Sequence, residues 1–215
     1  SLSWFPYNYN KRSITLNVAE PQGRELFLHL ATTADFIVET YPPGYLDAIG
    51  LGYKMLSEAS PRLILTSITP FGQTGPYRDW KADDIVACAM GGLMSICGDA
   101  DREPLRMGAP QAYMQAGAQA CTGTMIAHFQ RLATGVGSHV DVSMEEAIAN
   151  ALPETQINWW ADKRLRRRGA RGEYGGRMTQ SAFPAKDGFI ASHLFWGIGP
   201  GTRVSRMRSV RAPGG

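Results

Sequence analysis

At 215 residues, with 44% hydrophobic residues and a formal net charge of +3, the chain is long enough for one large domain with an appendage. No apolar run approaches the roughly 20 residues that cross a bilayer, and the first ten residues do not follow the pattern of a signal peptide. The basic residues gather at 163–171 and 203–211 without the aromatic or glycine pattern of a nucleic-acid-binding module. We therefore expect neither a membrane nor a nucleic-acid partner, and the basic loop is either a solvated surface or a site for an anionic ligand.

Short strand and helix patterns alternate over the first 70 residues. Strands are predicted at residues 13–17, 36–38 and 63–68, and helices beginning at Pro21 and spanning residues 54–59. Strand, helix, strand, helix and strand in so short a stretch are typical of a parallel sheet flanked by helices. The predicted fold class is therefore α/β.

The second half of the chain is mostly helical up to residue 160. A helix is predicted from Asp84, with an apolar stripe made of Ile85, Ala89, Met90, Leu93 and Met94. A longer helix over residues 111–133 is rich in small residues, which allow close approach of a neighbouring helix or ligand. A brief strand at 139–142 precedes a helix that begins with the capping box of Ser143 and Glu146. A hairpin is predicted over residues 181–192, with its turn at residues 186–188.

The loop from Phe71 to Asp84 is the strongest candidate for a binding segment. It contains Gly72 and Gly75, follows a strand and precedes a helix, which is where α/β folds place ligand-binding loops. Asp83 and Asp84 stand at the expected helix start, where carboxylates are favoured. The alternative is an ordinary surface turn.

Composition predicts a domain boundary near residue 160 and an aberrant or disordered tail over residues 200–215. The apolar pattern collapses after Trp196, and the chain begins with a strand pattern that has no earlier strand to pair with. We expect a fragment, or a reading frame lost near Gly199, with a disordered tail as the alternative.

Several segments in order resemble one family, the class III CoA-transferases, which includes formyl-CoA transferase, carnitine CoA-transferase and α-methylacyl-CoA racemase. The segments that carry the resemblance are Asn10-Lys-Arg-Ser13, the helix from Pro21, Glu39-Thr-Tyr-Pro-Pro-Gly44, Leu46-Asp47 with Gly50-Leu-Gly52, Phe71 to Asp79, Pro104-Leu-Arg-Met-Gly108 and Thr134 to Ser143. The resemblance spans residues 8 to about 196. It implies an incomplete Rossmann-like large domain over residues 1–160, then a linker and the start of a smaller α+β domain over residues 161–199. It also implies an interlocked dimer of chains longer than this one.

The resemblance also implies a coenzyme A site built from three segments. These are Leu16, Asn17, Val18 and Ala19; Thr40, Tyr41 and Pro42; and Lys81, Ala82, Asp83 and Asp84. Within them, the resemblance implies that Tyr41 lies against adenine, since aromatic faces suit a flat base. It implies that Lys81 meets a phosphate as a point charge and that the helix start at Asp83 offers free N–H groups. An ordinary strand-end tyrosine and a solvated lysine are the alternatives.

The catalytic position departs from the family pattern. Family transferases use an aspartate that attacks the acyl-CoA thioester, and this aspartate falls on Tyr113. A phenol is protonated at neutral pH and forms no acyl anhydride. The histidine of the racemase branch falls on Asp83, so we expect no racemisation by that pair.

Three interpretations of Tyr113 remain open. The chain is a CoA-transferase in which Tyr113 donates a hydrogen bond to the thioester oxygen, a non-catalytic subunit of a heteromeric transferase, or a degenerate CoA-binding protein. We expect no permanently bound cofactor and no metal, with acyl-CoA and a carboxylic acid as substrates. The expected assembly is a homodimer or a heterodimer with a paralogous subunit. Three cysteines fit no metal motif or closed disulfide set, which favours reduced thiols in the cytoplasm.

Overall fold

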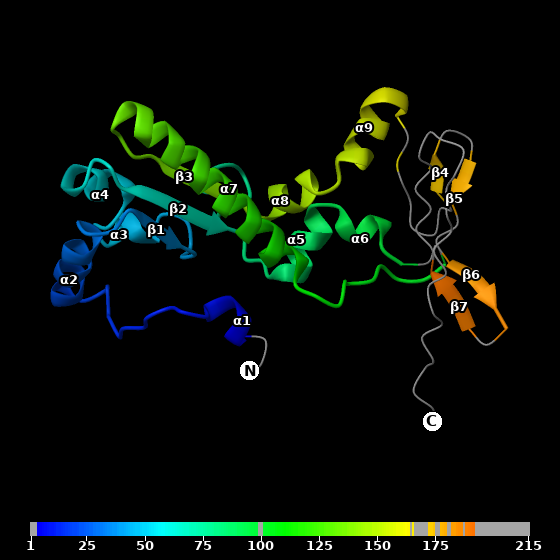
Figure 1. Cartoon of the computed structure of the whole chain (residues 1–215), viewed down its shortest axis with the longest axis horizontal. Coiled ribbons are helices and arrows are strands. Elements are labelled where there is room, and N and C mark those ends of the chain that lie inside the picture. Colours follow the sequence, from blue (N-terminus) through cyan, green and yellow to red (C-terminus); the bar gives the residue numbers. More distant parts are fainter. Residues whose placement is uncertain are drawn as a thin grey trace.

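A three-stranded parallel sheet forms the centre of the fold (Figure 1). The computed structural model describes residues 4–98, 101–163, 165, 172–174, 177–179, 182–186 and 188–191. The strands of the sheet are β1 (Phe36–Glu39), β2 (Ile64–Thr69) and β3 (His139–Ser143), in the order β1-β2-β3. The central strand β2 pairs in parallel with both neighbours. The α/β sheet predicted from the sequence is therefore confirmed.

Helices connect the strands of the sheet. α1 (Trp4–Asn8) and α2 (Pro21–Ala31) precede β1; α3 (Tyr45–Ala48) and α4 (Tyr53–Ala59) join β1 to β2; α5 (Asp84–Met90), α6 (Leu93–Ile96) and α7 (Gln111–Thr134) join β2 to β3; and α8 (Met144–Asn150) and α9 (Pro153–Asp162) follow β3. The long helix α7, drawn in green, lies along β2 and β3 (Figure 1), and α8 also contacts the sheet directly.

Two antiparallel hairpins follow α9 in sequence. They are formed by β4 (Gly172–Tyr174) with β5 (Arg177–Thr179), and by β6 (Ala182–Ala185) with β7 (Gly188–Ala191). Ala185 pairs with Gly188, so the hairpin predicted over residues 181–192 is confirmed. The predicted tail, residues 200–215, lies outside the described residues, as does most of the basic loop.

The strand predicted at residues 13–17 is wrong, because the chain forms no regular element there. A strand needs a neighbour to pair its backbone groups, and within the described residues the sheet offers this segment none. The Asn17 side chain instead accepts a hydrogen bond from the backbone N–H of Ala19 at 3.1 Å. This local contact turns the chain towards α2.

The helix predicted from Asp84 is divided in two by Gly91 and Gly92. Gly92 has a φ of +88°, which a residue with a side chain rarely adopts. A Cβ on Gly91 would collide with Ile148 of α8, so the absence of a side chain allows the two helices to touch. The left-handed backbone at Gly92 therefore separates α5 from α6 where the apolar pattern alone predicts continuation.

The apolar stripe predicted for this helix is also partly wrong. α5 buries the small side chains of Ala87 and Cys88, whereas Ile85 and Met90 are 40% and 41% exposed. Small residues are buried here because α5 approaches α7, whose own buried face consists largely of alanines. The larger side chains of α5 do not fit this narrow interface.

The sheet has an apolar core on each face. Between α5, α7, α8 and one face of the sheet, the buried residues are Ala87, Cys88, Ala112, Ala116, Ala120, Val142, Met144, Ala147 and Ile148. On the other face, α2 and α4 contribute Ala31 and Leu56, which pack with Leu63 and Leu65. Side chains alternate across a strand, so β2 contributes to both cores.

A buried arginine near the end of α7 joins the helix to the start of the sheet. The Arg131 side chain is 4% exposed. Its Nη1 donates to the carbonyl oxygens of Asp35 at 3.0 Å and Arg62 at 2.9 Å, just before β1 and β2. Its Nη2 donates to His128 Nδ1 at 2.8 Å, and the guanidinium lies 5.0 Å from the centre of the Phe36 ring. One guanidinium therefore satisfies two backbone carbonyls that lead into neighbouring strands.

Replacing this arginine is expected to destabilise the fold. Arg131→Met keeps an apolar stem but leaves both carbonyl groups without their donor, and we expect a loss of about 3 kcal/mol in the free energy of unfolding. Urea unfolding followed by circular dichroism measures this. Arg62→Met is the matched control, because the Arg62 side chain is exposed and only its backbone carbonyl meets Arg131. Equal losses from both substitutions would contradict the assignment.

Candidate functional site

The segment after β1 places an aromatic ring at the carboxyl end of the sheet. Thr40, Tyr41 and Pro42 follow the last residue of β1 and are exposed. The backbone N–H of Tyr41 donates to Glu39 Oε2 at 2.6 Å. The Tyr41 ring stacks on Tyr45, with centroids 4.8 Å apart and planes at 28°. Because Tyr45 covers one face of this ring, a flat base has only the other face available.

The loop after β2 contacts both neighbouring strand ends. The backbone N–H of Gln73 donates to Asp141 Oδ2 of β3 at 2.9 Å. On the other side, a Cβ placed on Gly44 would lie 3.3 Å from Arg78 Nη2. Gly44 has a φ of +77°, so its conformation and this close approach both favour glycine. The loops that follow β1 and β2 therefore meet, as expected for adjacent parallel strands.

Three aromatic rings stiffen this loop. The Phe71 ring lies edge-on to the rings of Tyr77 and Trp80, and the centroids of the Tyr77 and Trp80 rings are 4.5 Å apart. Tyr77 and Trp80 remain 42% and 55% exposed. The cluster holds the segment immediately before Lys81, whose side chain is exposed to solvent.

The two aspartates at the start of α5 have different roles. Asp83 is the N-cap, and its Oδ1 accepts a hydrogen bond from Val86 N–H at 3.3 Å. The Asp83 carboxylate thus uses one of the helix-start donors that sequence reasoning assigned to a phosphate. Asp84 is buried, with its side chain 5% exposed. A contact between this segment and CoA therefore depends on Lys81 and the exposed backbone rather than on the Asp84 carboxylate.

The buried carboxylate of Asp84 joins this segment to the predicted catalytic position. Asp84 Oδ1 accepts from the backbone N–H of Ala112 at 2.9 Å, in the first turn of α7. Asp84 Oδ2 accepts from Arg106 Nε at 3.1 Å. Tyr113 is the next residue after Ala112 and is 52% exposed. Asp84, the last residue of the predicted segment 81–84, is thus bonded to the residue before Tyr113, although 28 residues separate Asp84 from Ala112.

The first predicted segment, residues 16–19, is held by α2. A Cβ on Gly23 would collide with the Asn17 carbonyl oxygen, so the helix start lies directly against the backbone of this segment. Arg24 Nη1 donates to the Ile49 carbonyl oxygen at 3.0 Å, which ties α2 to the turn after α3. In the part of the chain that the structure describes, no hydrogen bond joins residues 16–19 to Tyr41, Lys81 or Tyr113.

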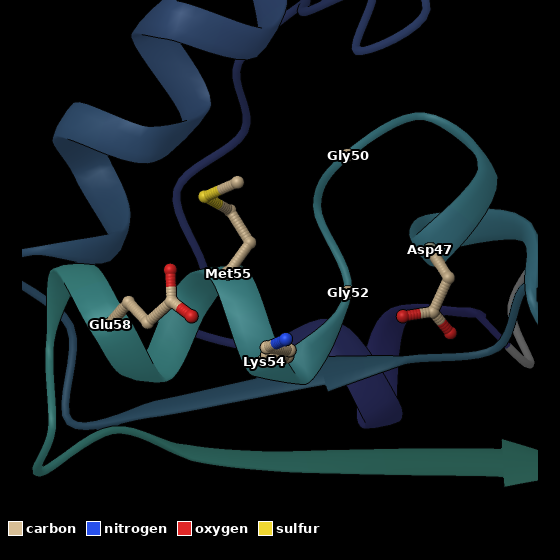
Figure 2. Close-up of a pocket in the computed structure, with 6 residues that line it drawn as sticks. All are labelled: Asp47, Gly50, Gly52, Lys54, Met55 and Glu58. Carbon is tan, nitrogen blue, oxygen red and sulfur yellow. The ribbon is translucent and has the colours of Figure 1, made fainter.

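A separate pocket of about 290 Å³ lies between α3 and α4 (Figure 2). Its lining residues are Asp47, Gly50, Gly52, Lys54, Met55 and Glu58. The lining contains the carboxylates of Asp47 and Glu58 and one ammonium group, that of Lys54. The pocket therefore carries a net negative charge, which does not suit a phosphate. None of its lining residues belongs to the three predicted CoA segments.

Sequence reasoning did not assign a role to Arg106. The residue was visible only inside the segment Pro104 to Gly108, and the partner that fixes it lies 22 residues earlier. Its side chain is 48% exposed. In the described residues there is no cluster of histidine, cysteine and acidic side chains that could hold a metal, and no helix long and apolar enough to span a membrane.

The thiol of Cys88 lies in the buried core between α5, α7 and α8. Burial raises the pKa of the Cys88 thiol, and the negative charge of Asp84 raises it further. Both effects disfavour the thiolate, which is the reactive form.

Cys88 is therefore expected to react slowly in the folded protein. Iodoacetamide at neutral pH should modify Cys88 at least about tenfold more slowly than in the same protein unfolded by guanidinium chloride, because both the thiolate fraction and access are reduced. Peptide mass spectrometry over time measures the rate at this residue. Equal rates in the folded and unfolded protein would contradict the buried position.

Comparison with known proteins identifies related sequences and folds. The family model described as CoA-transferase family III matches residues 1–195. The succinyl-CoA:(R)-benzylsuccinate CoA-transferase subunit BbsE of Thauera aromatica is 39% identical over 191 residues, covering 89% of this chain and 46% of that protein. The succinyl-CoA:glutarate CoA-transferase of Homo sapiens is 34% identical over 190 residues, covering 88% of this chain and 43% of that protein.

A solved structure has the same fold. The crystal structure of a CAIB/BAIF family protein from Brucella suis superposes with a TM-score of 0.75 at 32% sequence identity, covering 83% of this chain and 47% of that chain. This chain therefore spans about half the length of the proteins it matches.

Proposed function

Because the chain belongs to CoA-transferase family III, we propose that this protein transfers coenzyme A from an acyl-CoA to a carboxylic acid. The observation that supports the proposal is the hydrogen bond from Ala112 N–H to Asp84, which joins the last residue of the predicted segment 81–84 to the residue before Tyr113. The names of the two relatives support a narrower substrate class. Succinate, benzylsuccinate and glutarate each carry two carboxylates, so we propose a dicarboxylic acid as acceptor.

The proposed CoA site runs along the loops after β1 and β2. Lys81 is an exposed cation suited to a phosphate, and the free face of Tyr41 is suited to adenine. The contact between Gly44 and Arg78 places these two loops together. Residues 16–19, Thr40, Pro42, Ala82 and the backbone at Asp83 and Asp84 complete the proposed site, and CoA enters as a substrate with no permanently bound cofactor.

Tyr113 is proposed to stabilise the oxyanion of the reaction. The acceptor carboxylate attacks the thioester carbonyl carbon. The C–S bond then breaks, which releases CoA as a thiolate and leaves a mixed anhydride of the two acids. The thiolate then attacks the acceptor carbonyl of that anhydride and releases the donor acid as a carboxylate. In each tetrahedral intermediate the Tyr113 hydroxyl donates a hydrogen bond to the oxyanion. No proton is gained or lost overall.

A second candidate function is that of a non-catalytic subunit. The Thauera aromatica relative is itself named as a subunit, which favours this alternative. The exposed apolar side chains of Ile126, Phe129 and Leu132 on α7 support an assembly with further protein, either as an interlocked homodimer or with a paralogous subunit. A degenerate CoA-binding protein is the remaining possibility.

The division into a large domain over residues 1–160 and the start of a smaller domain over residues 161–199 also belongs to this proposal. A cytoplasmic location is proposed from the cysteines, because Cys88, Cys97 and Cys121 are all unpaired.

Removal of the Tyr113 hydroxyl tests the proposed role directly. In the full-length protein, Tyr113→Phe should lower kcat for CoA exchange between succinyl-CoA and glutarate by about 10²–10³, because an oxyanion donor is lost. Chromatography of the CoA esters measures the exchange. Tyr9→Phe is the matched control, since Tyr9 is 75% exposed and lies outside the site. Unchanged activity in Tyr113→Phe would exclude the hydroxyl from the mechanism.

The same assay separates the three functions. Exchange by the purified protein alone supports the transferase, and exchange only after addition of a co-expressed paralogue supports the subunit. CoA binding without exchange in either format leaves the CoA-binding protein.

A further inference from the structure

Arg106 is a half-exposed cation fixed by a buried anion. Its Nε donates to Asp84 Oδ2 at 3.1 Å, and the Asp84 side chain is 5% exposed while that of Arg106 is 48% exposed. The other oxygen of Asp84 accepts from Ala112 N–H at 2.9 Å. With both oxygens bound, the carboxylate cannot rotate freely. The guanidinium plane of Arg106 is therefore held relative to the start of α7.

The two terminal nitrogens of the Arg106 guanidinium remain available to bind a ligand. In the described part of the chain, no hydrogen bond or ion pair is formed by Nη1 or Nη2 of Arg106. These two nitrogens form a planar fork that matches the two oxygens of a carboxylate. One carboxylate, Asp84, thus orients an arginine whose free edge suits a second carboxylate.

The fixed arginine is linked to the proposed catalytic position through Asp84. Asp84 contacts both Arg106 and the backbone of Ala112, the residue immediately before Tyr113. The side chains of Tyr113 and Arg106 are both about half exposed, so each is accessible to a ligand. Asp84 and Arg106 form an ion pair with no net charge, and Nη1 and Nη2 of Arg106 remain as donors for an anion.

We propose that Arg106 binds the non-reacting carboxylate of a dicarboxylic acid substrate, with Asp84 as its positioning residue. This inference rests on the proposed function. The carboxylate that attacks the thioester must not be held in an ion pair, whereas the second carboxylate stays charged throughout the transfer. A fixed arginine therefore orients the acid without binding the oxygen that reacts.

The test measures binding of each substrate separately in the full-length protein. Isothermal titration with glutarate, pentanoate and CoA compares the wild type with Arg106→Gln. We expect Kd for glutarate to rise about ten- to a hundredfold, because a charge-assisted hydrogen-bonded pair is lost, while Kd for CoA changes less than about twofold. Pentanoate has the same chain length and one carboxylate, so its weaker binding should be unchanged by the substitution.

Two further variants keep the result interpretable. Arg62→Gln is the matched control, because Arg62 is exposed near the far end of α7, where its Nη1 lies 3.4 Å from the Gly135 carbonyl oxygen, and it should leave all three affinities unchanged. Arg106→Lys keeps the charge but not the fork and should restore part of the glutarate affinity. It also serves if Arg106→Gln does not fold, since a loss of glutarate affinity without a loss of CoA affinity remains measurable.

Each other outcome overturns the proposal. A rise in Kd for CoA alone would assign Arg106 to a CoA phosphate. Unchanged glutarate affinity in both folded variants would leave Arg106 with a structural role only. Because binding is measured without turnover, a wild type that binds glutarate through Arg106 but exchanges no CoA would contradict the proposed function and not this inference.

Discussion

The buried carboxylate of Asp84 is the constraint on which the candidate site depends. An ionised group inside a protein is tolerated only when its oxygens are satisfied, and here a backbone amide of α7 and a guanidinium satisfy them. The hydrogen bonds that meet this requirement also fix the start of α7 relative to α5. The loop after β2, the arginine and Tyr113 therefore share one geometric reference, although they lie far apart in sequence.

Much of the fold could be predicted because it depends on local pattern. The apolar runs at residues 36–38 and 63–68 became the strands β1 and β2, of which β2 is buried, and several alanines of residues 111–133 form the buried face of α7. Failures arose where distant neighbours decide the outcome. Residues 13–17 alternate like a strand but have no pairing partner in the described residues, and the break after α5 lies where Gly91 packs against Ile148 of α8. Neither constraint is visible within a short window of sequence.

The sequence predicted segments for the candidate site but not the contacts between them. Resemblance to a family indicated residues 16–19, 40–42, 81–84 and position 113, and in the structure Asp84 is bonded to the residue before position 113. The resemblance could not show that Asp84 is buried or that Asp83 caps its own helix, since both depend on how the first turns of α5 and α7 are placed. Arg106 was not identified because its partner is remote in the sequence, and a single arginine in a loop has no periodic pattern.

The hydrogen bonds from Arg131 to the Asp35 and Arg62 carbonyl oxygens have a consequence for the order in which the protein folds during synthesis. Its guanidinium reaches the carbonyl oxygen of Asp35 across 96 residues of sequence, and β3 follows only after α7 is complete. The central strand β2 therefore remains without one neighbour until the ribosome has released β3. Contacts of such high sequence separation slow folding, and an unpaired apolar strand invites association with other chains. Nascent chains of this protein should accordingly depend on chaperone binding until residue 143 has emerged.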